Sequence, residues 1–150
     1  MTAKEYLNQA FWLDRRINIT LAKAEKMRAI AEYKSPSTEN TGGSGSSSDK
    51  LQNTVEKIIE YENRADELID LLVDKRLEIE NAIQAVSDPV QREILERRYL
   101  LYQAWESHLD KHTGEITKGI AESMGYSIQH IFRLHGLALK NIQIPKDESK

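Results

Sequence analysis

The residues of this chain whose types and spacing suit chemistry gather near its carboxyl end. Gln129, His130 and Arg133 closely follow Ser127, which is placed to cap a predicted helix. Glutamine pairs with adenine and arginine with guanine through two hydrogen bonds each. The front half of such a helix enters the major groove when the helix binds DNA. We therefore expect these three side chains to contact base edges.

Further residues around this helix suit the sugar-phosphate backbone of the same duplex. They are Lys118, Tyr126, Ser127 and Lys140. The stretch 126–144 holds two cations and no acid, although the whole chain carries 24 Asp and Glu against 21 Lys and Arg. This local contrast favours nucleic acid as the partner. The competing interpretation is a plain helical hairpin whose polar face meets only water, and the pattern by itself does not choose between the two.

Other kinds of chemistry find little support in the sequence. His108 and His112 would share one face of a helix, a spacing that suits zinc, but no third ligand and no glutamate base accompanies them. We therefore expect no metal. No nucleophile elbow, glycine-rich phosphate loop or catalytic carboxylate pair occurs, so neither an enzyme nor a cofactor is predicted. Zero cysteines fit a reducing cytoplasm, and no apolar run suits a signal peptide or a membrane span.

The elements that must position these side chains are predicted to be helices, which makes the fold all-α. In the range 1–34, apolar residues alternate at steps of four and three, as in a coiled coil. Thr2 is expected to cap this helix, with Glu5 as its capping-box partner. The seam there is Tyr6, Ala10, Leu13, Ile17, Thr20, Ala24, Met27 and Ala31. The range 50–86 repeats the alternation, and its seam is Leu51, Val55, Ile58, Glu62, Ala65, Ile69, Leu72, Arg76, Ile79, Ile83 and Val86. Segment Leu51–Val86 holds nine acids against four bases.

The range 35–49, which reads SPSTENTGGSGSSSD, interrupts the two heptad arrays. It contains no large apolar residue, so it is predicted to be a flexible linker. Two long helices joined in this way most simply form a long antiparallel, coiled-coil-like hairpin. A homodimer that pairs the same heptads in parallel is the alternative, and the sequence does not exclude it.

The range 87–144 is predicted to form a separate helical domain, with a short tail over 145–150. Ser87 or Asp88 can cap a helix, and Pro89 suits the first helical turn. This helix is expected to run to about His108 and to present a wide apolar face. A polar loop containing Gly114 is expected after it.

The end of this domain has the parts of a helix-turn-helix. Thr117 is expected to cap a short helix that ends at Met124, and Gly125 can take the positive φ of a tight turn. Ser127 then caps the last helix. The residues expected to pack between the two helices are Ile120, Ala121, Met124, Ile131, Leu134, Ala138, Leu139 and Ile142.

Motifs spread over nearly the whole chain carry a resemblance to a known family. They are Met1–Leu7, Leu13–Ile17, Arg92, Ile94–Leu95, Arg98–Leu100, Trp105–Glu106, Ile120–Ala121, Met124–Ser127, His130–Ile131, Arg133–Gly136 and Ala138–Leu139. In these the chain resembles small phage proteins of Gram-positive hosts that are grouped under a domain of unknown function. Its C-terminal part is also similar to region 4 of bacterial sigma factors and to phage late-gene activators, in which the second helix reads promoter DNA.

The resemblance implies a transcription regulator in the cytoplasm of a bacterial host, with double-stranded DNA as its partner. It also implies that the acidic hairpin holds host RNA polymerase or a second copy. Ile128, Gln129, Phe132 and Arg133 take groove-facing positions in this comparison. The stretch Ser107–Gly119 departs from the family pattern as an apparent insertion, which is expected to extend the preceding helix and add a loop.

Two other functions remain open at this stage. The first is a protein-interaction module in which the coiled coil does the binding and the helix-turn-helix is a structural remnant or a protein-docking surface. The second is a regulator that mimics region 4 and competes for its polymerase site. A DNA-binding protein should show a positive surface from Ser127 to Lys140. An interaction module should show Ile128, Phe132 and Leu137 as one exposed apolar patch.

Overall fold

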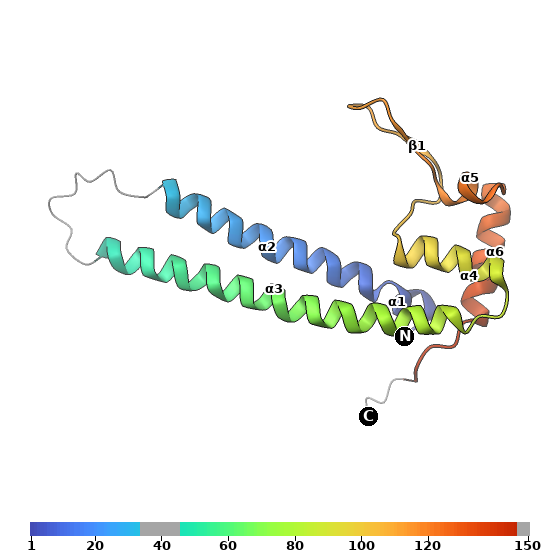
Figure 1. Cartoon of the computed structure of the whole chain (residues 1–150), viewed down its shortest axis with the longest axis horizontal. Coiled ribbons are helices and arrows are strands. Elements are labelled where there is room, and N and C mark those ends of the chain that lie inside the picture. Colours follow the sequence, from blue (N-terminus) through green and yellow to red (C-terminus); the bar gives the residue numbers. More distant parts are fainter. Residues whose placement is uncertain (34–45, 147–150) are drawn as a thin grey trace. The chain divides into compact units, whose positions relative to one another are not determined.

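The computed structural model describes residues 1–33 and 46–146, and most of these residues lie in helices, with one small β-hairpin (Figure 1). This confirms the predicted all-α class. The chain divides into two compact units. The hairpin unit is Trp12–Leu72, and the C-terminal unit combines Met1–Phe11 with Val73–Lys150. Among the described residues, no helix is long and apolar enough to cross a membrane.

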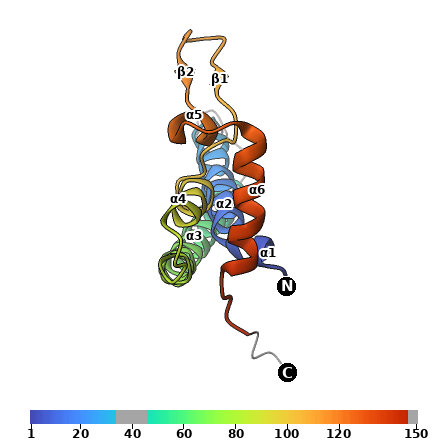
Figure 2. The ribbon, with the colours of Figure 1, turned by 90° about the vertical axis from the view of Figure 1, so that its right-hand side faces the viewer.

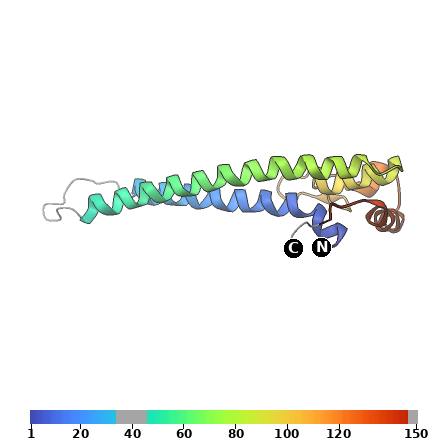
Figure 3. The same cartoon turned by 90° about the horizontal axis from the view of Figure 1, so that it is seen from below.

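The hairpin unit consists of α2 (Gln9–Tyr33) and α3 (Ser46–Gln84), which run antiparallel along each other between residues 12 and 72 (Figures 1 and 3). The residues buried between them are Ile17, Ala24, Ile58, Ala65 and Leu68. The two alanines are at most 1% exposed, so their small side chains lie within the packed seam. The antiparallel hairpin predicted from the two heptad arrays is therefore confirmed.

Three details of this unit differ from the sequence-based expectation. Leu68 is buried at 3% exposure, whereas Ile69, which was expected in the seam, is 39% exposed. A helix of 3.6 residues per turn brings both i+3 and i+4 near one face, so spacing alone does not select between adjacent apolar residues. Leu51 and Val55, also expected in the seam, are exposed. Helix α3 begins at Ser46, inside the expected linker, and the rest of that linker (35–45) lies outside the described residues.

The C-terminal unit begins with α1 (Ala3–Leu7), which the sequence did not separate from the following helix. The expected capping box is present: the Glu5 amide donates to Thr2 Oγ1, and the Thr2 amide donates to a Glu5 carboxylate oxygen. Asn8 ends this first helix. Tyr6 and Leu7 are buried, and α1 packs against α6 (Ile128–Asn141).

Helix α4 (Pro89–Leu95) starts as predicted, with Asp88 accepting from the amides of Val90 and Gln91. It continues as a π-helical turn, η1 (Glu96–Leu100), and ends there rather than near His108. The expected helical extension to His108 is therefore wrong. Tyr102 has a φ of 55°, and the Leu100 carbonyl accepts a hydrogen bond from Arg76 of α3. A partner distant in sequence thus takes up a carbonyl that a continuing helix would have used.

The predicted polar loop is instead a small antiparallel β-hairpin of β1 (His108–Leu109) and β2 (Ile116–Thr117). Its tip is closed by Asp110, whose Oδ1 accepts from the amides of His112 and Thr113. Gly114 takes a φ of 73°. Thr117 consequently lies in a strand and does not cap a helix, which corrects that prediction.

The last two helices are α5 (Ile120–Met124) and α6, and α5 is capped by Gly119. Ile94, Ile120 and Ile131 are fully buried and form the core between α4, α5 and α6. Val90, Trp105, Ala121, Met124 and Leu134 pack around them. This core fixes α6 against the rest of the C-terminal unit.

Candidate nucleic-acid interface

The connection between α5 and α6 is a three-residue turn with the geometry of a helix-turn-helix. Gly125 is left-handed at φ 73°, and its amide donates to the Glu122 carbonyl. The next amide, of Tyr126, donates to the Ala121 carbonyl at 3.0 Å. Ser127 Oγ accepts from the His130 amide and caps α6. Both predicted turn residues are therefore confirmed, and Figure 2 shows α5 beside the N-terminal end of α6.

The outward side of α6 carries a polar strip. Gln129, Arg133, Gly136 and Lys140 follow one another at i, i+4, i+7 and i+11, which places them along one side of the helix. The three side chains are exposed, whereas Ile131 and Ala138 on the opposite side are fully buried. We call these four residues the reading strip. Helix α6 contains no acid, so nothing on the helix itself offsets the two cations of the strip.

The apolar residues of α6 lie on the two flanks of the reading strip. Phe132 is 49% exposed and precedes Arg133, and its ring meets that of Trp105 edge to face at 5.5 Å. Leu137 is 42% exposed and lies on the other flank, four residues after Arg133. Ile128 is half-buried on the Phe132 side. The polar strip therefore separates these side chains, and they do not form one continuous apolar patch.

His130 and Arg133 hold each other in place at the front of α6. Arg133 Nη2 donates to His130 Nδ1 at 3.2 Å. A guanidinium has no acceptor, so Nδ1 must accept and the imidazole proton lies on Nε2. The Tyr126 ring meets the imidazole edge to face at 5.0 Å. The structure thus brings together three of the predicted site residues and leaves His130 with an N–H donor at Nε2.

The residues expected to contact phosphate are spread around this helix. Ser127 uses its oxygen as a cap, which leaves its hydroxyl hydrogen as a donor. Lys140 is exposed in the last turn of α6. Lys118 is exposed just before α5, and its carbonyl accepts from Gln103 Nε2 at 2.9 Å. The phosphate contacts expected of these residues stay predictions, because no contact within the chain tests them.

The β-hairpin joins the helix-turn-helix at a junction that the sequence did not reveal. The amides of Ile120 and Ala121 donate to the carbonyls of Ala104 and Trp105, at 2.9 and 3.2 Å. Without Ser107–Lys118 these would be i to i−4 pairs, as in an α-helix. The stretch therefore projects from a point where the two flanking segments are hydrogen-bonded to each other, which is the geometry an insertion at this point produces. A signal for this β-hairpin was present in the sequence, because the apolar residues Leu109 and Ile116 lie on either side of a turn at Gly114.

His135 is a second feature that sequence reasoning placed only in part. Its Nε2 lies 2.8 Å from the Tyr99 hydroxyl, with which it shares a hydrogen bond. Its ring also packs against Trp105 at 4.7 Å. Burial, together with the positive charges of Lys4 and Arg98, lowers the pKa of His135 to about 4. Burial raises the pKa of Tyr99 to about 12. The imidazole is therefore neutral at physiological pH and serves packing.

We expect His135 to make the C-terminal unit less stable in mild acid. Its pKa is about 4 in the fold and about 6.5 in an unfolded chain, so below pH 6.5 the unfolded chain takes up the proton first. The stability that the neutral His135 side chain contributes to the fold is intact above about pH 6.5 and is lost as the pH falls toward 4. Thermal unfolding of the wild type and of His135→Gln across this range measures it. The variant should show a flatter pH dependence, whereas His108→Gln, an exposed control, should follow the wild type.

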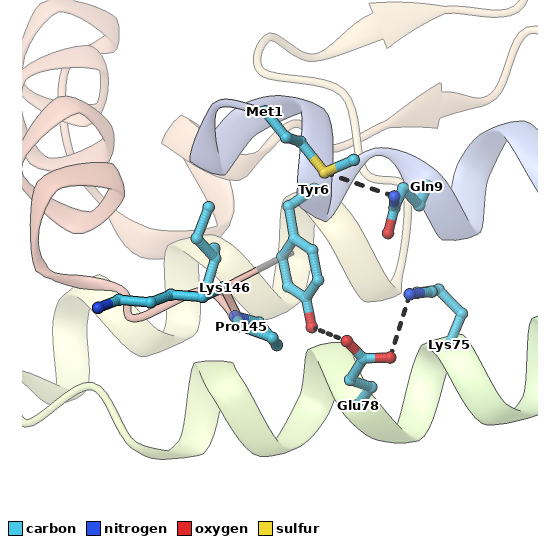
Figure 4. A pocket seen from close by; sticks show the side chains of 8 residues that line it. Met1, Tyr6, Gln9, Lys75, Glu78, Pro145 and Lys146 are labelled. Carbon is cyan, nitrogen blue, oxygen red and sulfur yellow. Dashed lines mark hydrogen bonds and ion pairs between the residues drawn. The ribbon is translucent and has the colours of Figure 1, made fainter. Parts of the chain in front are cut away.

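A hollow of about 370 Å³ lies elsewhere in the C-terminal unit, beside Tyr6 (Figure 4). Tyr6 donates from its hydroxyl to Glu78 Oε1 at 2.9 Å, and Lys75 Nζ donates to Glu78 Oε2 at 3.1 Å. Burial and the Glu78 carboxylate raise the pKa of Tyr6 well above its usual value. None of the predicted site residues lines this hollow, and its central polar groups bond to one another. We assign it no ligand.

The chain matches no protein-family model, no curated protein and no solved structure. The function of the protein must therefore follow from the geometry and chemistry of the residues at this site.

Proposed function

We propose that this protein is a sequence-specific DNA-binding transcription regulator that places α6 in the major groove. The observation that carries the proposal is the reading strip. A helix held by a helix-turn-helix presents exposed Gln129 and Arg133 at its front, with Lys140 behind them and no acid on the helix. These are the side chains that pair with adenine, guanine and phosphate. The resemblance to small phage proteins and to sigma region 4 supports promoter DNA in a phage-infected host as the setting.

Each residue then has a distinct role. Gln129 and Arg133 contact base edges, and the His130 Nε2 proton can donate to a base acceptor beside them. The Arg133–His130 hydrogen bond holds the guanidinium over the front of α6, which lowers the entropy lost when it binds. Tyr126, Ser127, Lys118 and Lys140 contact the sugar-phosphate backbone and set the register of the helix.

A second candidate is a protein-interaction module, with host RNA polymerase as the partner. Its support is the exposure of Phe132 and Leu137 on α6. The surface of α6 favours DNA over a protein partner, because the reading strip separates Phe132 from Leu137. An apolar docking helix would gather its anchors on one face.

The proposal is tested by selecting genomic DNA fragments with the full-length protein and then measuring variants on the selected site. Arg133→Ala should weaken binding by about 1–3 kcal/mol, which is roughly 5- to 150-fold in Kd, and relax the preference at one base pair. Lys140→Ala should weaken all sequences alike and reduce the slope of affinity against salt.

The matched control is Lys111→Ala, which removes an exposed cation from the β-hairpin tip. It should change neither the affinity for DNA nor the slope of affinity against salt strongly. A scrambled duplex at two salt concentrations separates base readout from charge. An Arg133→Ala protein with unchanged affinity and unchanged base preference would favour the interaction module instead.

A further inference from the structure

The hairpin unit carries opposite charges on its two long sides. One side is defined by Tyr61, because Lys23 of α2 and Lys57 of α3 both place their ammonium groups over its ring, at 6.0 and 5.1 Å. The other side is defined by the ion pair between Arg28 of α2 and Glu62 of α3. The buried seam lies between these two sets of contacts. We call the first the basic side and the second the acidic side.

Heptad spacing extends the basic side along both helices. Its cations are Arg16, Lys23, Lys50, Lys57 and Arg64. The acids nearest to them, Glu60 and Glu67, are paired with Lys57 and Arg64 at 3.3 and 3.2 Å. Exposed apolar side chains accompany these cations, namely Ile19, Ile30 and Leu71. The basic side therefore combines a net positive charge with an apolar row.

The acidic side has the same construction with the opposite sign. Its acids are Asp14, Glu25, Glu62 and Asp66, and its cation Arg28 is neutralised by Glu62. Its exposed apolar side chains are Leu21, Val55, Ile59 and Ile69. Two of these, Val55 and Ile69, belong to the heptad pattern of α3 and yet lie outside the buried seam. The acidic side thus also presents an apolar row to solvent.

We propose that the basic side of one copy docks on the acidic side of a second copy. The two sides match in length, because both run along α2 and α3 within the same unit, and they are complementary in charge. Docking would also cover both apolar rows, whereas a nucleic acid on the basic side would neutralise the cations but leave Ile19 and Leu71 uncovered. The contact joins two different surfaces, so a dimer leaves one side of each kind free for a further copy. The inference does not depend on DNA binding.

Sedimentation equilibrium of the full chain tests this docking. The apparent mass should rise with protein concentration and fall when NaCl is raised from about 50 mM to about 500 mM, because salt screens the exposed charges. Two matched variants each reverse the charge at two positions of one side. They are Lys23→Glu with Lys57→Glu on the basic side, and Glu25→Lys with Asp66→Lys on the acidic side. Circular dichroism verifies that both variants stay helical.

Each variant alone should self-associate at least about tenfold more weakly than the parent. An equimolar mixture of the two should associate again, because the acidic side of one variant meets the intact basic side of the other. A variant that associates as well as the parent would overturn the proposal, since it would show pairing of like sides. A parent chain that stays monomeric at low salt, or a mixture that stays monomeric where the parent associates, would also overturn it.

Discussion

Ile131→Ala should lower the free energy of unfolding of the C-terminal unit by about 2–5 kcal/mol. Ile131 is fully buried with Ile94 and Ile120, so the truncation removes packed atoms from the point where α4, α5 and α6 meet. The surrounding side chains belong to three different helices, which limits how far they can close the space. Guanidinium unfolding followed by Trp105 fluorescence, in a Trp12→Phe background, measures the loss.

Leu137→Ala is the matched control, because it truncates an apolar residue of the same helix that is 42% exposed. Its cost should be well below that of Ile131→Ala, since little packed surface is lost. Equal losses for the two variants would mean that the buried face of α6 is assigned wrongly, and with it the outward direction of the reading strip.

Gly119→Ala should also destabilise this unit, by about 1–3 kcal/mol or more. A Cβ at Gly119 would lie 2.3 Å from the Glu106 carbonyl carbon and 2.6 Å from the Ser107 nitrogen, so backbone must move. That movement would loosen the hydrogen bonds that tie Ile120 and Ala121 to Ala104 and Trp105. Thermal unfolding of the variant measures the effect, and the start of α5 should be the first region to lose amide protection.

Gly136→Ala provides the opposite case within the same unit. Gly136 lies inside α6, and a Cβ there would meet nothing within 4 Å. Alanine is the better helix former, so this change should stabilise the unit by up to about 1 kcal/mol. A Gly119→Ala variant that is as stable as the wild type would contradict the close contact at the base of the β-hairpin. Because Gly136 belongs to the reading strip, weaker DNA binding by the stabilised Gly136→Ala protein would further indicate close approach of DNA to this helix.

The sequence by itself determined the features that depend on neighbours three or four residues away. The cap of Thr2 and Glu5, the start at Asp88 and Pro89, and the turn through Gly125 were all predicted correctly, because helix caps are made by local hydrogen bonds. The alternation of four and three likewise predicted two long helices, and the linker between them favoured an antiparallel hairpin without excluding a parallel homodimer. The reading strip follows from the same kind of regularity, since a capped helix start fixes which later residues share a face.

Only the tertiary structure decided where the predicted helices end and which of their surfaces stay exposed. The helix after Pro89 ends at Leu100, where the guanidinium of Arg76 takes up the free carbonyl and contacts Tyr102, 24 and 26 residues away. His135 is half-buried and neutral because it packs against Tyr99, 36 residues earlier. The two charged sides of the hairpin likewise depend on which residue of α2 meets which residue of α3. Such contacts join distant segments, and their energies depend on burial and geometry that spacing along one helix does not contain.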